Sequence, residues 1–203
     1  MNRTVHVCFV GPDGAGKSTI ADGVENALTT NGWTIARLNA RPPVVDVRTN
    51  QDFDFTDPHA QEPRNLARSM TKAAGKFGYA WLRTLRARIQ HRSAGEPVLL
   101  MEERGWLDHG VDNRRYRIHP TAAKVFLKTW RVAPKPDRTI VLTGDHDTIV
   151  RRKEELPAPE VQRQLDLWVE LATTGRMGSV IVLDSTSLSL DETVAAAVDF
   201  VTG

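Results

Sequence analysis

The sequence is almost free of cysteine. Cys8 is the single cysteine in 203 residues, so no disulfide can form within the chain. A fold that uses no disulfide suits a reducing compartment, and we expect a cytoplasmic protein. Cys8 lies inside an apolar run, where we expect it to act as a small packing residue. A reactive thiol is the alternative, which burial would disfavour.

Long hydrophobic runs are also missing. No apolar stretch approaches the roughly 18 residues of a membrane-spanning helix, so we expect no membrane segment. The short apolar run Val5–Val10 is followed directly by a glycine-proline loop, which is not the pattern of a signal peptide.

Neither sign of charge dominates. The chain has 27 Lys and Arg against 25 Asp and Glu, a net charge of +2. This balance gives no strong affinity for polyanions, so nucleic acid is not an expected partner. With 40% hydrophobic and 26% charged residues, the composition excludes a disordered chain and suits one domain over residues 1–203.

A glycine-rich loop organises the chain. Residues 11–18 read Gly-Pro-Asp-Gly-Ala-Gly-Lys-Ser and match the phosphate-binding pattern G-x-x-x-x-G-K-[ST] at every fixed position. The run Val5–Val10 before the loop predicts a buried strand, and apolar residues from Ile20 to Leu28 recur with helical spacing. A chance glycine-rich turn is the alternative, and the strand and helix around the loop favour a nucleoside triphosphate site.

Strand, glycine loop and helix form the geometry that phosphate binding requires. Glycines let successive N–H groups turn toward an anion, and the helix N-terminus adds its dipole. Lys17 can then reach the β- and γ-phosphates, and the Ser18 hydroxyl can ligate Mg²⁺. The predicted ATP-binding residues are Asp13, Gly14, Ala15, Gly16, Lys17, Ser18 and Thr19.

Strands and helices alternate along the whole chain. Further strands are predicted at residues 33–38, 97–101, 139–143 and 180–183. The alternation predicts an α/β fold of three layers, a five-stranded parallel sheet flanked by helices, as in P-loop NTPases. Glu102 and Glu103 follow the third strand, where ligands of such sheets bind. One of the two should approach Mg²⁺ or take a proton from an acceptor, unless both merely end the strand.

Two segments allow two interpretations each. Residues 39–63 contain four prolines and an acidic cluster, which indicates a mobile or acceptor-side loop, or an ordinary surface loop. Residues 105–120 are polar, and their run Arg114–Arg117 is either a phosphate contact or solvated charge. His109 and His119 lack the ligand spacing of a zinc site.

Residues 64–92 predict a helix that is broken or kinked near Gly75 and Gly78. Its second half carries an apolar stripe with a repeat of four residues and a basic face opposite. The stripe consists of Phe77, Trp81, Leu85 and Ile89, and the basic face of Lys76, Arg83 and Arg86. The basic face is either solvated or a row of cations facing an anionic acceptor.

The loop at 11–19 and the pair Glu103-Arg104 resemble the thymidylate kinase-like branch of the nucleoside monophosphate kinase superfamily. The resemblance covers nearly the whole chain, but only the loop matches a strict motif of the family. It implies an ATP- and Mg²⁺-dependent kinase of a small-molecule acceptor, with a nucleoside monophosphate as the expected acceptor. Gly105-Trp106 departs from the tyrosine of the family motif, so a nucleoside, sugar or specialised metabolite stays an alternative.

Motif and resemblance together assign roles to individual residues. The predicted catalytic residues are Lys17, Glu103, Arg104 and Arg152. Acceptor binding is predicted for Asp13, Arg41, Arg83 and Asp108. Arg151, Arg152 and Lys153 are predicted to belong to a short lid at 151–160, and Ser18 and Glu103 to hold the metal.

A function of another class also fits the phosphate loop. An NTP-driven switch or accessory ATPase would bind ATP without a small acceptor. The arginine-rich segments and the predicted lid favour the kinase. The expected partners are ATP and the acceptor. Formation of a homodimer is a further possibility that the sequence leaves open.

Overall fold

The computed structural model describes residues 4–38, 62–153 and 156–203. The strands are β1 (Thr4–Val10), β2 (Thr34–Arg37), β3 (Val98–Glu103), β4 (Arg138–Thr143) and β5 (Ser179–Asp184). The helices are α1 (Lys17–Thr30), α2 (Leu66–Gln90), α3 (Asp108–Val111), α4 (Pro120–Lys128), α5 (His146–Arg152), α6 (Ala158–Ala172) and α7 (Leu190–Thr202), and η1 (Thr129–Arg131) is a 3₁₀ turn.

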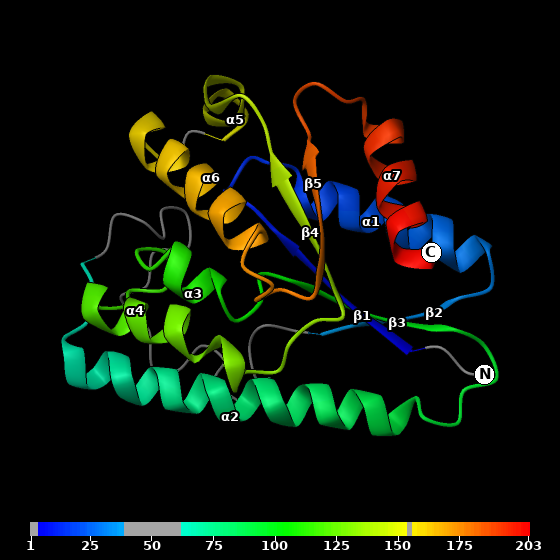
Figure 1. The fold of residues 1–203 in the computed structure, drawn as a ribbon, viewed down its shortest axis with the longest axis horizontal. Helices are drawn as coiled ribbons and strands as arrows, with labels where there is room; N and C mark the ends of the chain where they lie inside the picture. The colour runs from blue at the N-terminus through cyan, green and yellow to red at the C-terminus, as the bar shows by residue number, and fades with distance from the viewer. Residues whose placement is uncertain (1–3, 39–61, 154–155) are drawn as a thin grey trace, which may run out of the picture.

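The strands form a parallel sheet in the order β2-β3-β1-β4-β5. This confirms the predicted α/β fold with a five-stranded parallel sheet between helices (Figure 1). From β1 the chain passes to β2 and β3 on one side of β1 and then to β4 and β5 on the other side, so the sheet reverses its order at β1. In open parallel sheets the crevice at such a reversal is the place where ligands bind.

Strand β1 supplies the core on both faces of the sheet. Val5, Val7 and Phe9 are buried in one cluster with apolar residues of α1 and α7. The alternate residues Cys8 and Val10 belong to a second cluster on the opposite face, with residues of α3 and the end of α6. Because successive side chains of a strand point to opposite faces, a strand buried on both sides reads as a continuous apolar run.

Helices α2 and α4 pack together on the second face of the sheet, along the lower edge of Figure 1. On the first face α7 crosses α1, and the crossing is close at Gly23. A Cβ atom at Gly23 would lie 2.5 Å from Cγ2 of Val194. Gly23 is therefore the residue that lets the two helices approach.

The third strand is longer than predicted. β3 extends to Glu103, so Glu102 and Glu103 are the last residues of the strand instead of following it. The register pairs Glu103 with Phe9 and Glu102 with Cys8 of β1. Paired residues share a face of a sheet, so the Glu103 side chain lies on the α1 face and Glu102 on the α2 face.

Helix α2 differs from the prediction in two ways. It is one continuous helix of 25 residues, with no break at Gly75 or Gly78. In addition, most of the predicted apolar stripe is exposed, because Trp81, Leu85 and Ile89 retain 47%, 54% and 64% of their accessible surface. The buried face consists of small residues instead, namely Ser69, Ala73, Ala80, Thr84 and Ala87.

In the part of the chain that the structure describes, none of the helices combines the length and the apolar character needed to cross a bilayer.

Candidate functional site

The glycine loop between β1 and α1 has the backbone that its sequence predicts. Gly11, Gly14 and Gly16 have φ values of 145°, 88° and 83°, in the region that favours glycine. Side chains are also excluded by contact, because a Cβ at Gly11 or Gly14 would lie 2.5 Å from the carbonyl oxygen of Leu142 or Ile149. The loop is thus held between the end of β4 and α5, with Gly16 as the N-cap of α1.

Lys17 is folded back onto the loop. Its side chain is buried, and Nζ donates to the carbonyl oxygens of Gly11 and Pro12, each at 2.7 Å, and to Oδ1 of Asp13 at 3.4 Å. Burial lowers the pKa of Lys17, the Arg104 charge lowers it further, and Asp13 opposes both. The ammonium group is therefore held within the loop by three oxygens of the loop itself.

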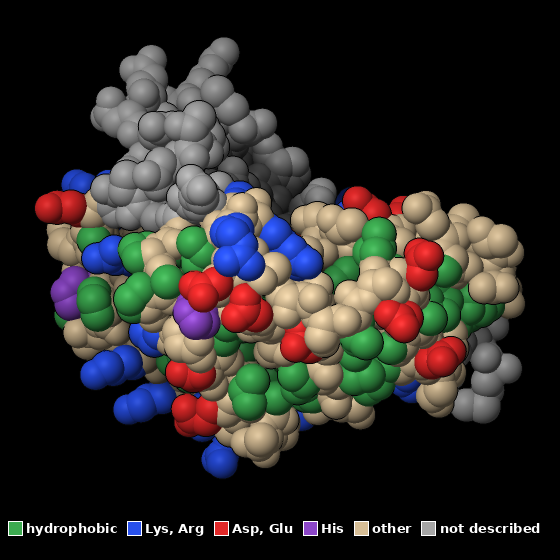
Figure 2. Space-filling view, turned by 90° about the horizontal axis from the view of Figure 1, so that it is seen from above, with side chains coloured by type: hydrophobic (Ala, Val, Ile, Leu, Met, Phe, Trp, Pro, Cys, Tyr) green, Lys and Arg blue, Asp and Glu red, His purple; other side chains and the backbone are tan. Residues whose placement is uncertain are grey.

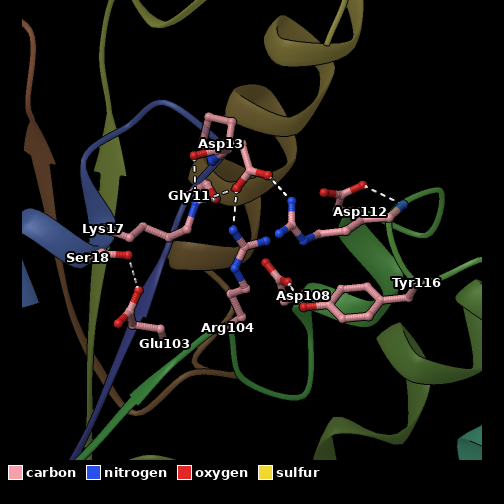
Figure 3. A network of polar contacts seen from close by, with 11 residues as sticks. Gly11, Asp13, Lys17, Ser18, Glu103, Arg104, Asp108, Asp112 and Tyr116 are labelled. Carbon is pink, nitrogen blue, oxygen red and sulfur yellow. Dashed lines mark hydrogen bonds and ion pairs between the residues drawn. The ribbon is translucent and has the colours of Figure 1, made fainter. Parts of the chain in front are cut away.

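Asp13 is the centre of a cluster of three cations (Figure 3). Its Oδ1 lies 2.5 Å from Nη2 of Arg104 and 3.4 Å from Nζ of Lys17, while Oδ2 accepts from Nη1 of Arg115. The Asp13 side chain is only 3% exposed. The structure therefore brings together three of the predicted site residues, Asp13, Lys17 and Arg104, and adds Arg115.

The Arg104 backbone has a left-handed conformation, with φ at 64°. A residue other than glycine seldom adopts this conformation without a functional or packing constraint. Burial disfavours the charge of Arg104, but Asp108 and Asp13 outweigh it and raise the pKa of the guanidinium. This turn directs the Arg104 side chain toward the loop, as Figure 3 shows.

Ser18 and Glu103 meet at the carboxyl end of β3. The Ser18 hydroxyl donates to Oε2 of Glu103 at 2.6 Å, and Nη1 of Arg37 lies 3.5 Å from Oε1. A hydroxyl and a carboxylate suit Mg²⁺, which usually takes one or two protein oxygens together with water and phosphate oxygens. Among the described residues no group of three or more His, Cys, Asp and Glu could hold a metal. A metal ion at Ser18 and Glu103 would therefore need further oxygen ligands from a nucleotide and from water.

Glu102 belongs to a different network on the α2 face. Its carboxylate accepts from Nη2 of Arg83 and lies 3.2 Å from Nε2 of His6, and Arg83 also donates to the Leu38 carbonyl at 3.0 Å. Burial alone would raise the pKa of Glu102, but His6 and Arg83 hold it below its usual range. The predicted acceptor residue Arg83 is thus anchored to the end of β3.

Asp108 lies beneath the cation cluster. Its side chain is buried, and Oδ2 accepts from the Tyr116 hydroxyl at 2.6 Å. Burial raises the pKa of Asp108, with Arg104 and Lys17 acting in the opposite direction. The predicted contact of Asp108 with an acceptor stays a prediction, because its described hydrogen bond is internal.

A cavity opens between α2 and the turn that follows β3. We call it the Tyr79 cavity; it is lined by Lys76, Tyr79, Ala80, Arg83, Arg104, Gly105, Trp106 and His109. Arg104 belongs both to this cavity and to the cluster around Asp13. The cavity therefore adjoins the glycine loop and combines aromatic walls with three cationic side chains.

His109 forms a neutral part of that cavity wall. Its ring stacks on Tyr116 and Phe126, with centroids 4.1 and 5.2 Å away. Burial lowers the pKa of His109 to about 3, and nearby lysines act in the same direction. At neutral pH His109 is therefore an uncharged, flat surface.

Among the described residues of the predicted lid, Arg151 and Arg152 make hydrogen bonds away from Asp13. At the end of α5, Arg151 donates to Thr148 at 2.8 Å and Arg152 to the carbonyl of Ser185 at 3.1 Å. Arg41 and most of the predicted loop at 39–63 lie outside the described residues, as do 154–155. The roles of all these residues stay predictions.

Several residues of the site carry no specific role in the sequence analysis. The sequence places Arg115 only in a basic run and Arg37 only in a strand. Arg37 could be suspected from topology, since it ends the strand beside β3. Tyr79 and Tyr116 gave no signal, because a lone tyrosine on a helix or in a loop has many uses.

The face over α5, α6 and α7 carries charges of both signs. Figure 2 shows acidic and basic side chains interspersed on it. Mixed charges of this kind produce no extended field of one sign on that face.

Comparisons with known proteins give a likeness in fold. Neither a protein-family model nor a curated protein sequence matches the chain. Among solved structures, deoxyadenosine kinase from M. mycoides, determined with dCMP and dCDP bound, aligns over 96% of both chains with 16% sequence identity and a TM-score of 0.49.

Proposed function

We propose that this chain is an ATP-dependent phosphotransferase that transfers the γ-phosphoryl group of ATP to a nucleoside monophosphate. The proposal rests on one observation: Arg104 joins the glycine loop to the Tyr79 cavity. The loop is suited to the donor phosphates, and the adjoining cavity is suited to an acceptor.

The loop side of the site supports binding of the donor. Lys17 and Ser18 begin α1 at the point where the helix dipole favours an anion. Mg²⁺, held by Ser18 and Glu103, would neutralise charge on the β- and γ-phosphates. Phosphate oxygens would take over the Lys17 hydrogen bonds now made by Gly11 and Pro12.

The cavity side supports an acceptor with a flat ring and an anionic group. Tyr79, Trp106 and His109 offer aromatic surfaces for a base, and Lys76 and Arg83 offer positive charge. A phosphate oxygen of the acceptor would attack the γ-phosphorus while the bond to the bridging oxygen of ADP breaks. A phosphate dianion is itself a nucleophile, so this reaction needs no general base.

Asp13 acts in this proposal as a stand-in for phosphate. Without substrate its carboxylate balances Arg104 and Arg115. With substrate the two guanidinium groups would turn to the transferring phosphoryl group, where positive charge stabilises the transition state. Asp13 would then be free to orient the acceptor.

The test is ADP release from ATP and Mg²⁺ with a panel of nucleoside monophosphates, nucleosides and sugars. We expect at least one nucleoside monophosphate to stimulate release, and Lys17→Ala to lower turnover by a factor of about 10²–10³ while staying folded. The matched control is Lys128→Ala, an exposed lysine at the end of α4, which should keep full turnover.

The panel also tests the alternatives. Stimulation by nucleosides or sugars alone would refute the monophosphate as acceptor. Hydrolysis that no acceptor changes would favour a switch or accessory ATPase. Full turnover of Lys17→Ala at saturating ATP would refute the proposal.

A further inference from the structure

Helix α2 carries large apolar side chains on its outer face. In its second half, Trp81, Leu82, Leu85 and Ile89 retain between 47% and 64% of their accessible surface. Val132 extends this surface beyond the helix, because it is 55% exposed and its carbonyl oxygen accepts from Nε1 of Trp81 at 2.8 Å. We call these five residues the apolar patch of α2. Single exposed apolar side chains are common, but a contiguous patch usually marks an interaction site.

The first half of the same face consists of small residues. At about 100° per residue, the exposed residues Ala74, Gly75 and Gly78 lie on the same side of α2 as the apolar patch. Glycine is unfavourable inside a helix, and packing within the chain requires neither glycine. A Cβ atom at Gly75 or Gly78 would meet no atom of the described residues within 4 Å beyond its own helix. The helix backbone is therefore open to a close neighbour at these positions.

The two halves of this face are complementary in shape. Copies related by a two-fold axis use the same surface twice, so the surface must be complementary to itself. Two α2 helices that cross antiparallel with the axis near Ala80 meet this requirement. Leu82 then faces Gly78 of the second copy, and Leu85 faces Gly75. The large side chains of each copy lie against the small residues of the other.

The middle of this face carries no charge. Every exposed residue of α2 between Thr71 and Leu85 is uncharged. Arg83 lies on a different side of the helix, where it pairs with Glu102. Arg86 follows at the edge of the apolar patch. Two copies can therefore meet without opposing like charges at the centre, with arginine at the rim, as is typical of protein interfaces.

The size of the apolar patch suits a dimer. About half of each of its five side chains is accessible, so each presents roughly 100 Å² to solvent. A stable interface removes about 800 Å² from each copy, of which somewhat more than half is apolar. The apolar patch alone supplies about that apolar share.

We propose that the chain forms a two-fold dimer through α2, in which the apolar patch of each copy packs against the small residues of the other. The Tyr79 cavity is lined from a different side of α2, by Lys76, Tyr79 and Arg83, so the candidate site stays open in both copies. The dimer goes beyond the proposed function and does not depend on it.

Sedimentation velocity of the full chain, between about 1 and 200 µM, measures the mass. We expect twice the chain mass of 22.6 kDa in the upper part of this range. Leu85→Glu should weaken the dimer by about 100-fold or more, because each interface then buries two unpaired charges. Leu190→Glu is the matched control, since Leu190 at the start of α7 is 51% exposed against 54% for Leu85, and it should leave the dimer intact. Circular dichroism checks that each variant is folded.

Gly78→Leu tests the arrangement of the two helices. Leucine favours a helix more than glycine does, and a single copy has room for it at this position, so the fold should be kept. In the dimer the new side chain would collide with Leu82 of the second copy, and the dimer should weaken by about tenfold or more. The substitution adds apolar surface, so a flat apolar partner would bind the variant more tightly instead.

Several results would overturn the proposal. A chain that stays monomeric up to about 200 µM is one. Equal effects of Leu85→Glu and Leu190→Glu, or an undisturbed dimer of Gly78→Leu, are others. A monomeric chain that sediments with vesicles of phosphatidylcholine and phosphatidylserine, more strongly in Gly78→Leu, would assign this face to a membrane surface. Because these tests measure association, they are independent of turnover.

Discussion

Replacing Asp13 by asparagine should destabilise the protein without substrate and increase the stabilisation that ATP gives. The substitution keeps the shape of the side chain but removes the negative charge that balances Lys17, Arg104 and Arg115. Three cations would then lie together at the loop without their carboxylate.

The size of the effect follows from burial. Removing one partner of a fully buried ion pair costs about 3–5 kcal/mol. The Arg104 and Arg115 side chains are 20% and 22% exposed, so water screens part of the repulsion and we expect about 2–3 kcal/mol. For a domain of this length that corresponds to a fall in Tm of about 4–12 °C.

Thermal and urea unfolding with and without ATP and Mg²⁺ measure both effects. Asp22→Asn is the control, since the Asp22 side chain is 60% exposed where it pairs with Arg37, and it should change stability by less than about 1 kcal/mol. ATP phosphates supply the missing charge, so ATP should raise the Tm of Asp13→Asn more than that of the parent. Equal stability of the Asp13 and Asp22 variants would refute the role of Asp13 as a stand-in for phosphate. A Tm increase with ATP that is smaller for Asp13→Asn than for the parent would refute it as well.

Three further predictions follow from single residues. The pKa of His109 is about 3 in the folded protein and about 6.5 when unfolded, so its contribution to stability is complete above pH 6.5 and falls toward pH 3. The fall is at most about 1.4 kcal/mol per pH unit. His109→Phe should reduce this fall in stability when the free energy of unfolding is measured with urea between pH 7 and 5. The same dependence of stability on pH in the variant and the parent would contradict this. Glu103→Gln should raise the Mg²⁺ concentration for half-maximal turnover about tenfold or more, because Ser18 alone would remain; an unchanged titration argues against the metal site. Gly23→Ala should cost about 1–3 kcal/mol by overpacking at the α1–α7 crossing, and Val194→Ala should restore stability in the double variant if the contact at 2.5 Å is the cause.

The sheet could be predicted because its three central strands, β1, β3 and β4, are buried on both faces. Such strands appear as short apolar runs separated by helical spacing, and the glycine loop fixes which of them is β1. The geometry of the loop could also be predicted, since three glycines at these positions have few other uses.

The separate positions of Glu102 and Glu103 could not be predicted with a strand that ends at residue 101. Once β3 extends through Glu103, alternation along the strand directs one carboxylate to Ser18 and the other to Arg83. Which face each side chain takes depends on the register with β1, and no local pattern contains that register.

The orientation of α2 shows where hydrophobic periodicity fails. A stripe of large apolar residues normally marks the buried face of a helix. Here the packed face consists of alanine, serine and threonine, which let the helix lie close to its neighbours, and Trp81, Leu85 and Ile89 remain exposed. A scale that weights large side chains cannot detect a close contact made by small ones.

The cluster around Asp13 required tertiary structure. Arg115 lies 102 residues from Asp13 in the sequence, and a run of arginines alone does not distinguish a buried ion pair from solvated charge. The left-handed backbone at Arg104 is equally invisible in the sequence, because arginine has no preference for that conformation.

The most direct test of the central claim is the fate of the γ-phosphate. ATP labelled with ³²P at the γ position is incubated with the protein, Mg²⁺ and each nucleoside monophosphate, and the labelled products are separated. We predict that label appears in a nucleoside diphosphate at a rate that Lys17→Ala reduces to background. Label found in inorganic phosphate alone, at a rate independent of every acceptor, would contradict the account.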